Sequence, residues 1–443
     1  MTVFGIKRYT TRKFGVDFPA RGANKLARMK RRHLVLIASL LLAAGVWLSI
    51  GSVKRADVAR KRASAEVAQS ASAEARQTAK SHSEFVKEWN ASHPPQRKGT
   101  NAADIYRQAF ELFDALTDDE KEMIKSPRDE VDADKAEELF KKIQPILELM
   151  RQAGVADYSD WGTGPVRFNT PMPHLVKSME LGRLALWSAA YRFKDDPRGA
   201  VNDLAARTPL ARSLSGTLIG FLVGTSFENS ATDLVAQNAG AMDAVATAQF
   251  TAMLRDPSYA DGFSRAMEGE VSGVRAFADE IATATTADEA YRKLAPLSGN
   301  LDDIQPTVAE MQAAGFDLAS VKAGLQKVID IDQQFGRTLG MPESQFQAWW
   351  SQVNADTNPI VKLLLPTLDS VRSKALTTQV QRAMLGAGIA VMQNGPAQLD
   401  AFTDPTTGSV FTYAPTADGG FELRSTFQVK GKPVTMAFPS ARR

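Results

Sequence analysis

Side chains that commonly carry enzymatic chemistry are sparse in this sequence. Cysteine is absent, which excludes disulfides, thiolate nucleophiles and cysteine-ligated zinc or iron–sulfur clusters. Outside the boundary of the apolar segment described below, the histidines are His82, His93 and His174, and no two of them have metal-ligand spacing. His174 opens a helical pattern, so a packing or capping role is a simpler interpretation than a catalytic base.

Carboxylates offer the remaining acid–base chemistry. Asp157 and Asp160 stand beside Trp161, and two carboxyls that meet across a cleft can act as general acid and base. Their spacing leaves open whether they meet. The chain has no Gly-x-Ser-x-Gly nucleophile elbow, no Gly-x-x-x-x-Gly-Lys-Ser/Thr phosphate loop and no strand–glycine–helix context for a nucleotide. We therefore predict no catalytic, cofactor-binding or metal-binding residues and no cofactor.

The charge is unevenly distributed along the chain. The formal charge is +3, but residues 1–33 hold ten Lys or Arg and one acid, Asp17. Residues 34–443 hold 43 basic and 49 acidic side chains, a net charge of −6. Because an acidic body lacks the electrostatic footprint for phosphate backbones, we expect no nucleic-acid partner.

An apolar segment follows the basic N-terminus. Residues 34–53 are uncharged, and twenty residues are about the length that a helix needs to cross a bilayer. Within fifteen residues, six Lys or Arg precede this segment and five follow it, and over longer flanks the count is ten against seven. This bias predicts a single-pass signal-anchor in a bacterial inner membrane, with a cytoplasmic N-terminus and a periplasmic body.

Two alternatives remain for this segment. A cleaved secretory signal is compatible with the small residues around Ser49-Ile50-Gly51. A buried core helix of a soluble protein is the other, although clustered flanking bases argue against it. The uncleaved anchor fits best because the apolar run and the basic region before it are both long for a signal peptide.

The remaining chain is predicted to be mainly α-helical. Residues 54–89 have high helix propensity, no Gly or Pro and few apolar residues, which predicts a helical stalk with a coiled-coil dimer as an alternative. From Asn101 the apolar spacing is helical, Thr117-Asp-Asp-Glu120 is a capping-box pattern, and a further helix begins near Asp132 and ends at a Gly154 cap. The acidic side chains of this region fit a solvated helix face better than a cation site.

Further helices are expected after the Gly- and Pro-rich loop 162–173. One runs from His174 to about Phe193, and another begins at the corner Asp195-Asp196-Pro197 and continues to Leu210. Glycines 216, 220 and 224 would lie along one side of a helix over 214–227, either packed in the core or against a membrane. No register repeats, so a repeat array is not supported.

The C-terminal part changes from helix to strand. Ala-rich helices over 228–355 contain Trp349 and Trp350, which are either packing residues or a partner-binding site, and one long helix is expected over 359–393. Alternating segments over 409–413, 421–427 and 433–438, separated by Asp418-Gly-Gly420 and Lys430-Gly-Lys432, predict a three-stranded antiparallel β meander. In chain order, the expected domains are a basic cytoplasmic tail 1–33, a transmembrane helix 34–53, a stalk and linker 54–100, an irregular α-hairpin body 101–395 and a β element 396–443.

Four segments of the helical body, 101–110, 160–162, 173–175 and 195–204, carry a family resemblance. With these segments, the layout resembles a group of uncharacterised bacterial proteins with a membrane anchor, a long helical domain and a small C-terminal β element. The end of the chain, Asp404-Pro-Thr-Thr-Gly-Ser-Val-Phe-Thr-Tyr413 and 418–423, is similar to the close of type II secretion pseudopilins, with Phe411 in place of the first Tyr. The N-terminus lacks the pilin processing sequence. The resemblance implies this architecture but no activity.

Three functions from different classes follow. The first is a non-catalytic extracytoplasmic scaffold or protein-interaction module, with the membrane as one partner through residues 34–53 and a protein as another, in an oligomeric state left open. The second is a component of a secretion or pilus-like envelope machine, suggested by the C-terminal strands. The third is an envelope enzyme with a carboxylate site.

Overall fold

The structure is a computed structural model that describes residues 98–126, 132–163, 170, 172–254, 258–294, 311, 313, 315–365 and 368–440. The predicted basic tail, transmembrane helix and stalk, with His82 and His93, lie outside the described residues apart from 98–100. Within the described residues, no helix is both long and apolar enough to cross a membrane.

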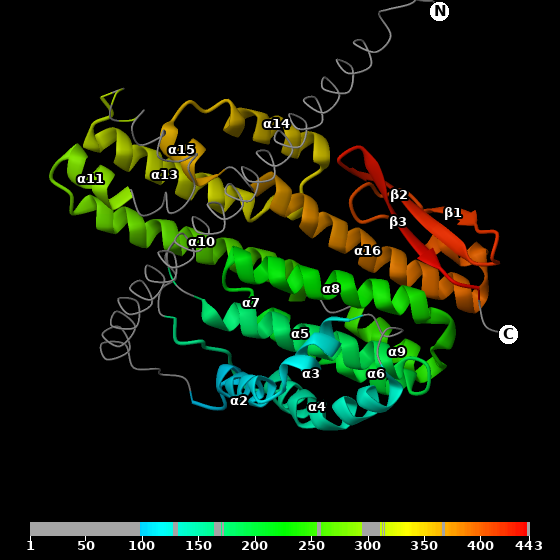
Figure 1. Cartoon of the computed structure of the whole chain (residues 1–443). Coiled ribbons are helices and arrows are strands. Elements are labelled where there is room, and N and C mark those ends of the chain that lie inside the picture. The colour runs from blue at the N-terminus through cyan, green and yellow to red at the C-terminus, as the bar shows by residue number, and fades with distance from the viewer. Residues whose placement is uncertain are drawn as a thin grey trace, which may run out of the picture. The chain divides into compact units, whose positions relative to one another are not determined.

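The described chain is mainly helical and ends in a small sheet, as predicted (Figure 1). The first helices are α2 (Ala102–Asp114), α3 (Asp118–Lys125), α4 (Ala133–Gly154), α5 (Pro173–Arg192), α6 (Pro197–Ala205), α7 (Arg207–Leu214), α8 (Leu218–Asn238) and α9 (Ala244–Leu254). The later helices are α10 (Ser258–Ala282), α11 (Ala287–Leu294), α13 (Leu318–Phe335), α14 (Glu343–Asn354), α15 (Pro359–Leu364) and α16 (Leu368–Asn394). Short 3₁₀ turns η2 (Ala239–Ala241), η4 (Thr338–Gly340) and η5 (Pro396–Ala401) join some of them.

Side-chain caps begin several of these helices where the sequence predicts them. Thr117 and Glu120 form the complete capping box at α3, and Asp132 accepts hydrogen bonds from two backbone N–H groups of α4. Asp196 caps α6 in the same way. The four unsatisfied N–H groups at a helix start explain why short polar side chains define these boundaries.

Some predicted boundaries are wrong. Gly154 is the last residue of α4 rather than a left-handed cap, and a Cβ there would come within 2.9 Å of Pro209 Cγ. The helix expected from Pro197 to Leu210 is divided at Ala206 into α6 and α7. The long helix expected over 359–393 is two helices, because Leu365 precedes Pro366 in the sequence and a residue before proline avoids continued helix.

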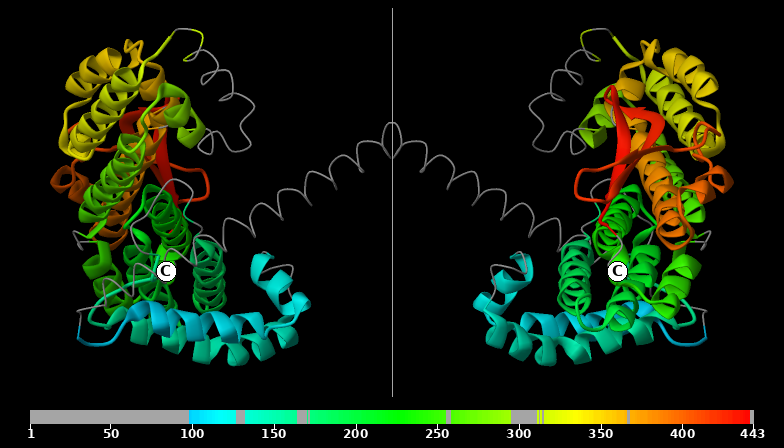
Figure 2. Two further views of the ribbon diagram at one scale, coloured as in Figure 1. Left: turned by 90° about the vertical axis from the view of Figure 1, so that its left-hand side faces the viewer. Right: turned by 90° about the vertical axis from the view of Figure 1, so that its right-hand side faces the viewer.

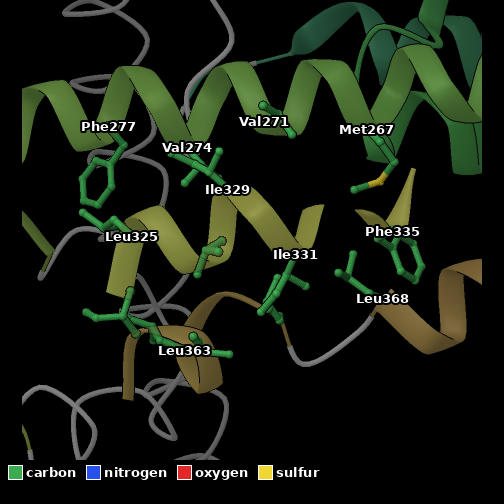
Figure 3. Close-up of a cluster of buried hydrophobic side chains, with 14 of the residues drawn as sticks. Met267, Val271, Val274, Phe277, Leu325, Ile329, Ile331, Phe335, Leu363 and Leu368 are labelled. Carbon is green, nitrogen blue, oxygen red and sulfur yellow. The ribbon is translucent and has the colours of Figure 1, made fainter. Parts of the chain in front are cut away.

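Three clusters of buried apolar side chains form the core. The first, here the α10 cluster, joins α10, α13, α14 and α15, and Figure 3 shows Met267, Val271 and Phe277 of α10 pointing towards α13. The second, the α4 cluster, joins α2, α4, α5 and α7, and Figure 2 shows α2 and α4 side by side. The third, the sheet cluster, joins α6, α9, α16 and the sheet.

The C-terminal sheet is the predicted antiparallel meander, in the order β1 (Thr412–Pro415), β2 (Phe421–Val429) and β3 (Lys432–Phe438). Lys430 and Gly431 connect β2 to β3 with φ of 51° and 75°, as a two-residue hairpin turn requires. One face packs on α16, where a Cβ at Gly388 would overlap the Phe438 ring. Asp404, which precedes the sheet, is buried and accepts hydrogen bonds from Thr406, Thr407 and Ser425.

Candidate functional site

The structure gives Asp157 and Asp160 local structural roles. Asp157 Oδ2 accepts a hydrogen bond from the Thr100 N–H at 2.7 Å, and Asp160 Oδ1 accepts one from the Gly162 N–H at 2.8 Å. Asn101, which caps α2, also exchanges hydrogen bonds with the Asp160 backbone. The Asp157 carboxylate and the Asp160 backbone thus hold the chain at the start of α2, whereas the Asp160 carboxylate stabilises its own loop.

His174 belongs to an aromatic stack. Its ring lies 4.6 Å from the Trp161 ring, and Trp161 also stacks on Tyr106 and Phe110. Burial, with a smaller contribution from the Arg107 charge, lowers the pKa of His174 from 6.5 to about 4. His174 is therefore neutral at pH 7, and its ring packs within this stack.

The tryptophan pair and the glycines are also packing features. Trp350 is buried, Trp349 is half-buried, and both contact Phe335 and Phe346. Gly224 faces Ala211 of α7, where an added Cβ would lie 3.1 Å from the Ala211 Cβ. Gly216 precedes α8 rather than lying in it, because Thr217 caps the helix.

A buried acid that the sequence analysis did not single out lies between α10 and α13. Asp332 is 4% exposed, and its carboxyl has no hydrogen bond or ion pair among the described residues. It sits on the apolar face of α13, between the buried Val328, Ile329 and Phe335. The carboxyl lines a groove, described below, but the residue is largely shielded from water, and poor solvation of a carboxylate without a hydrogen-bond donor costs free energy.

A second acid, Glu270, also affects the pKa of Asp332. Burial, followed by repulsion from the Glu270 charge, raises the pKa of Asp332 from 3.8 to about 7. Burial also raises the pKa of Glu270 on α10, although Glu270 accepts a 3.0 Å hydrogen bond from the Leu218 N–H at the start of α8. The two carboxyls therefore interact and disfavour simultaneous ionisation.

Asp332 forms part of the lining of an open groove of about 640 Å³, here the α10–α13 groove. Met267, Val271 and Gly336 complete its buried or half-buried lining. The exposed residues around it are Ser264, Glu268, Ser272, Arg275, Gln333 and Arg337. Neither arginine has an ion pair or hydrogen bond from its side chain to any described residue, and the same is true of the Glu268 carboxylate.

The groove has the size of sites that hold drug-sized ligands. It presents one acid at the bottom and charges of both signs at the rim, with no histidine, lysine or tyrosine among its lining residues. In the described part of the chain, no group of three or more His, Asp or Glu side chains is arranged to hold a metal ion. The arrangement suits binding of a charged group, and Asp332 could also transfer a proton near neutral pH.

A sequence signal for this site did exist. Asp332 follows Val328 by four residues and precedes Phe335 by three, and Glu270 follows Met267 by three and precedes Val274 by four. Each acid therefore interrupts an apolar helical stripe. The arginines carried no such signal, because exposed arginines are ordinary on helices.

No family model, curated protein or solved structure matches the chain.

Proposed function

We propose that this protein is a single-pass, membrane-anchored scaffold or interaction module of the bacterial cell envelope, without catalytic activity. Residues 34–53 would anchor it in the inner membrane, the basic N-terminus would be cytoplasmic, and the helical body would bind a protein partner in the periplasm. The charge bias around the apolar segment and the acidic body support this placement.

The observation that carries the proposal is the set of unpaired charges at the α10–α13 groove. By comparison, the buried Asp203 binds Arg151, Arg192 and Ser188. Arg372 likewise donates to the Thr338 and Met341 carbonyls and pairs with Glu343. Among the described residues, the buried Asp332 has no such partner and the exposed Arg275 and Arg337 have no ion pair, and a bound segment of another protein would supply them.

Site-specific crosslinking tests this function. A photoreactive amino acid at Gln333, in the groove, should crosslink the full-length protein to a defined partner in its own membranes. The matched control is Gln237, which lines a second hollow of about 710 Å³ between α3, α5 and α8. The adduct at position 333 should disappear in the R275Q/R337Q variant. Absence of an adduct, or equal adducts at both positions, would argue against an interaction module that uses this groove.

The packing of the sheet on α16 favours a second candidate, a component of a secretion or pilus-like machine. In such a machine the chain would assemble in multiple copies. Because the chain contains no cysteine, one cysteine at Thr435, exposed on β3, gives a clean background for crosslinking with a bis-maleimide of spacer length matched to neighbouring copies. Crosslinked multimers would support this candidate, and exclusively monomeric protein in membranes would count against it.

The raised pKa of Asp332 is the observation that favours the third candidate, an envelope enzyme. Its test is a panel of hydrolase substrates presented to the wild-type protein and to Asp332→Asn. A turnover that depends on Asp332 would replace the interaction module with an enzyme.

A further inference from the structure

We propose that the α10–α13 groove binds a basic side chain, an ammonium or guanidinium group, from a partner segment whose neighbouring residues are acidic. This inference rests on the proposed function, because it specifies the chemistry of the partner that the groove receives.

Asp332 defines what enters the bottom of the groove. Its buried carboxyl lacks a hydrogen-bond donor among the described residues, and Glu270 lies close enough to repel its charge. A cation would donate hydrogen bonds to Asp332 and would allow both carboxyls to ionise. A carboxylate at the same place would add a third acid to the pair.

The other charged groups around Asp332 shape the rest of the ligand. Glu268 and Arg275 belong to α10, and Arg337 follows α13. On the side of α8, the Leu218 N–H donates a hydrogen bond to Glu270 and is therefore already used. Two arginines at the rim would repel an isolated cation. Carboxylates on either side of the inserted basic group would pair with Arg275 and Arg337, and arginine binds carboxylates through two parallel hydrogen bonds.

The space agrees with a short segment. A groove of about 640 Å³ accommodates a few residues rather than a folded domain. An extended segment with an acid–base–acid order would place its central side chain over Asp332 and its flanking side chains at the rim.

The probe is the peptide acetyl-Asp-Ala-Lys-Ala-Asp-amide, titrated calorimetrically at pH 7 into the full-length protein in nanodiscs. Two buffers with different ionisation enthalpies report the protons exchanged on binding. We expect proton release, because burial raises the pKa of Asp332 to about 7 and the carboxyl ionises when the lysine arrives. Replacing lysine by norleucine in the peptide should weaken binding about tenfold or more.

Protein variants localise the effect. Asp332→Asn should weaken binding about tenfold and remove the proton release. Asp330→Asn, which removes an exposed carboxylate from the same helix, should change neither quantity. The R275Q/R337Q variant should bind the peptide more weakly, but the complex that still forms should release protons as the wild-type complex does. Thermal unfolding of each variant checks that it is folded.

Several results would overturn the inference. These are no binding of the probe, proton uptake in place of release, or equal affinity for the norleucine peptide. Its failure is separable from that of the proposed function. If the crosslink at position 333 persists in Asp332→Asn but is lost in R275Q/R337Q, the groove still binds a protein and the basic side chain is wrong.

Discussion

At the level of single residues, burial without a partner determines how Asp332 behaves. Its carboxyl lies among the apolar side chains of the α10 cluster, and water solvates it poorly. The folded protein therefore holds a proton on Asp332 over a pH range in which the unfolded chain does not. This difference has a direct consequence for stability.

We predict that Asp332 makes stability depend on pH between about 4 and 7. The pKa rises from 3.8 to about 7 on folding, so the folded state binds more protons in this range and the free energy of unfolding decreases as pH rises. The Asp332→Asn variant has no carboxyl to titrate at this position. Relative to wild type, its free energy of unfolding should therefore rise by about 2–4 kcal/mol between pH 4.5 and pH 8. Urea unfolding at both pH values measures it, with Asp330→Asn as the control. A difference that does not change with pH would contradict the raised pKa.

His174 should give the opposite pH dependence. Its pKa falls from 6.5 to about 4 on folding, so its contribution to stability is present above pH 6.5 and is lost as pH falls towards 4. His174→Phe keeps an aromatic ring against Trp161 but does not titrate. Relative to wild type, this variant should gain about 2 kcal/mol when the pH is lowered from 7.5 to 5. Two-dimensional NMR of the imidazole ring provides a second measurement, and a ring that titrates near 6.5 would rule out this account.

Residue roles were predictable from sequence only where they are local. The Thr117–Glu120 capping box involves groups three residues apart, and the structure contains it as predicted. Asp332 and Glu270 are 62 residues apart, and their interaction depends on the packing of α13 on α10. Periodicity identifies each residue as an acid on an apolar helix face, but it does not show that the two acids lie close together in the fold.

At the level of elements, close packing of the sheet on α16 leaves no space for a side chain at Gly388 but leaves space at Gly386. Gly388 faces the Phe438 ring, whereas a Cβ at Gly386 would have its nearest neighbour, Phe402 Cε1, at 3.8 Å. Both lie inside a helix, where glycine is otherwise unfavourable. Their replacement by alanine should therefore have opposite effects.

We expect Gly388→Ala to destabilise the protein by about 1–3 kcal/mol, because the new methyl group forces Phe438 and β3 to move. Gly386→Ala should stabilise it by about 0.5–1 kcal/mol through helix propensity. Chemical unfolding of the two variants against wild type measures both values. Equal effects of the two substitutions would show that the sheet does not pack on α16 at Gly388.

Secondary-structure elements were predicted well where turn residues mark their ends. Turn residues between the alternating segments identified all three strands, although β1 begins at Thr412 rather than Ser409. The break between α15 and α16 was missed despite Pro366, because apolar periodicity continues across it. Periodicity reports which face is buried and says little about where a helix is interrupted.

At the level of the whole molecule, orientation in the membrane is the central prediction. The bases flanking residues 34–53 number six and five within fifteen residues, and the excess before the segment favours a cytoplasmic N-terminus. Alkaline phosphatase fused after Arg443 should be active, because this enzyme requires export to fold. Green fluorescent protein fused at the same place is the reciprocal control and should be dark when exported through the general secretion pathway. Fluorescence of this second fusion would place the body in the cytoplasm.

The α8 helix links the three clusters of the core. Phe221 belongs to the α10 cluster, Phe227 to the α4 cluster and Val235 to the sheet cluster. Its contacts with α16 join residues that are far apart in the sequence. Arg382 pairs with Glu228 at 3.0 Å, and Thr378 donates a hydrogen bond to Asn229 at 2.6 Å. These partners are separated by 154 and 149 residues, respectively.

This separation matters while the chain is being made. At synthesis rates of about 5–20 residues per second, α8 emerges roughly 7–30 seconds before α16 exists to cover it. Over that interval an apolar helix surface remains open to water and to other chains. Newly made molecules, in which α16 does not yet cover α8, should therefore aggregate more readily than molecules that are already folded.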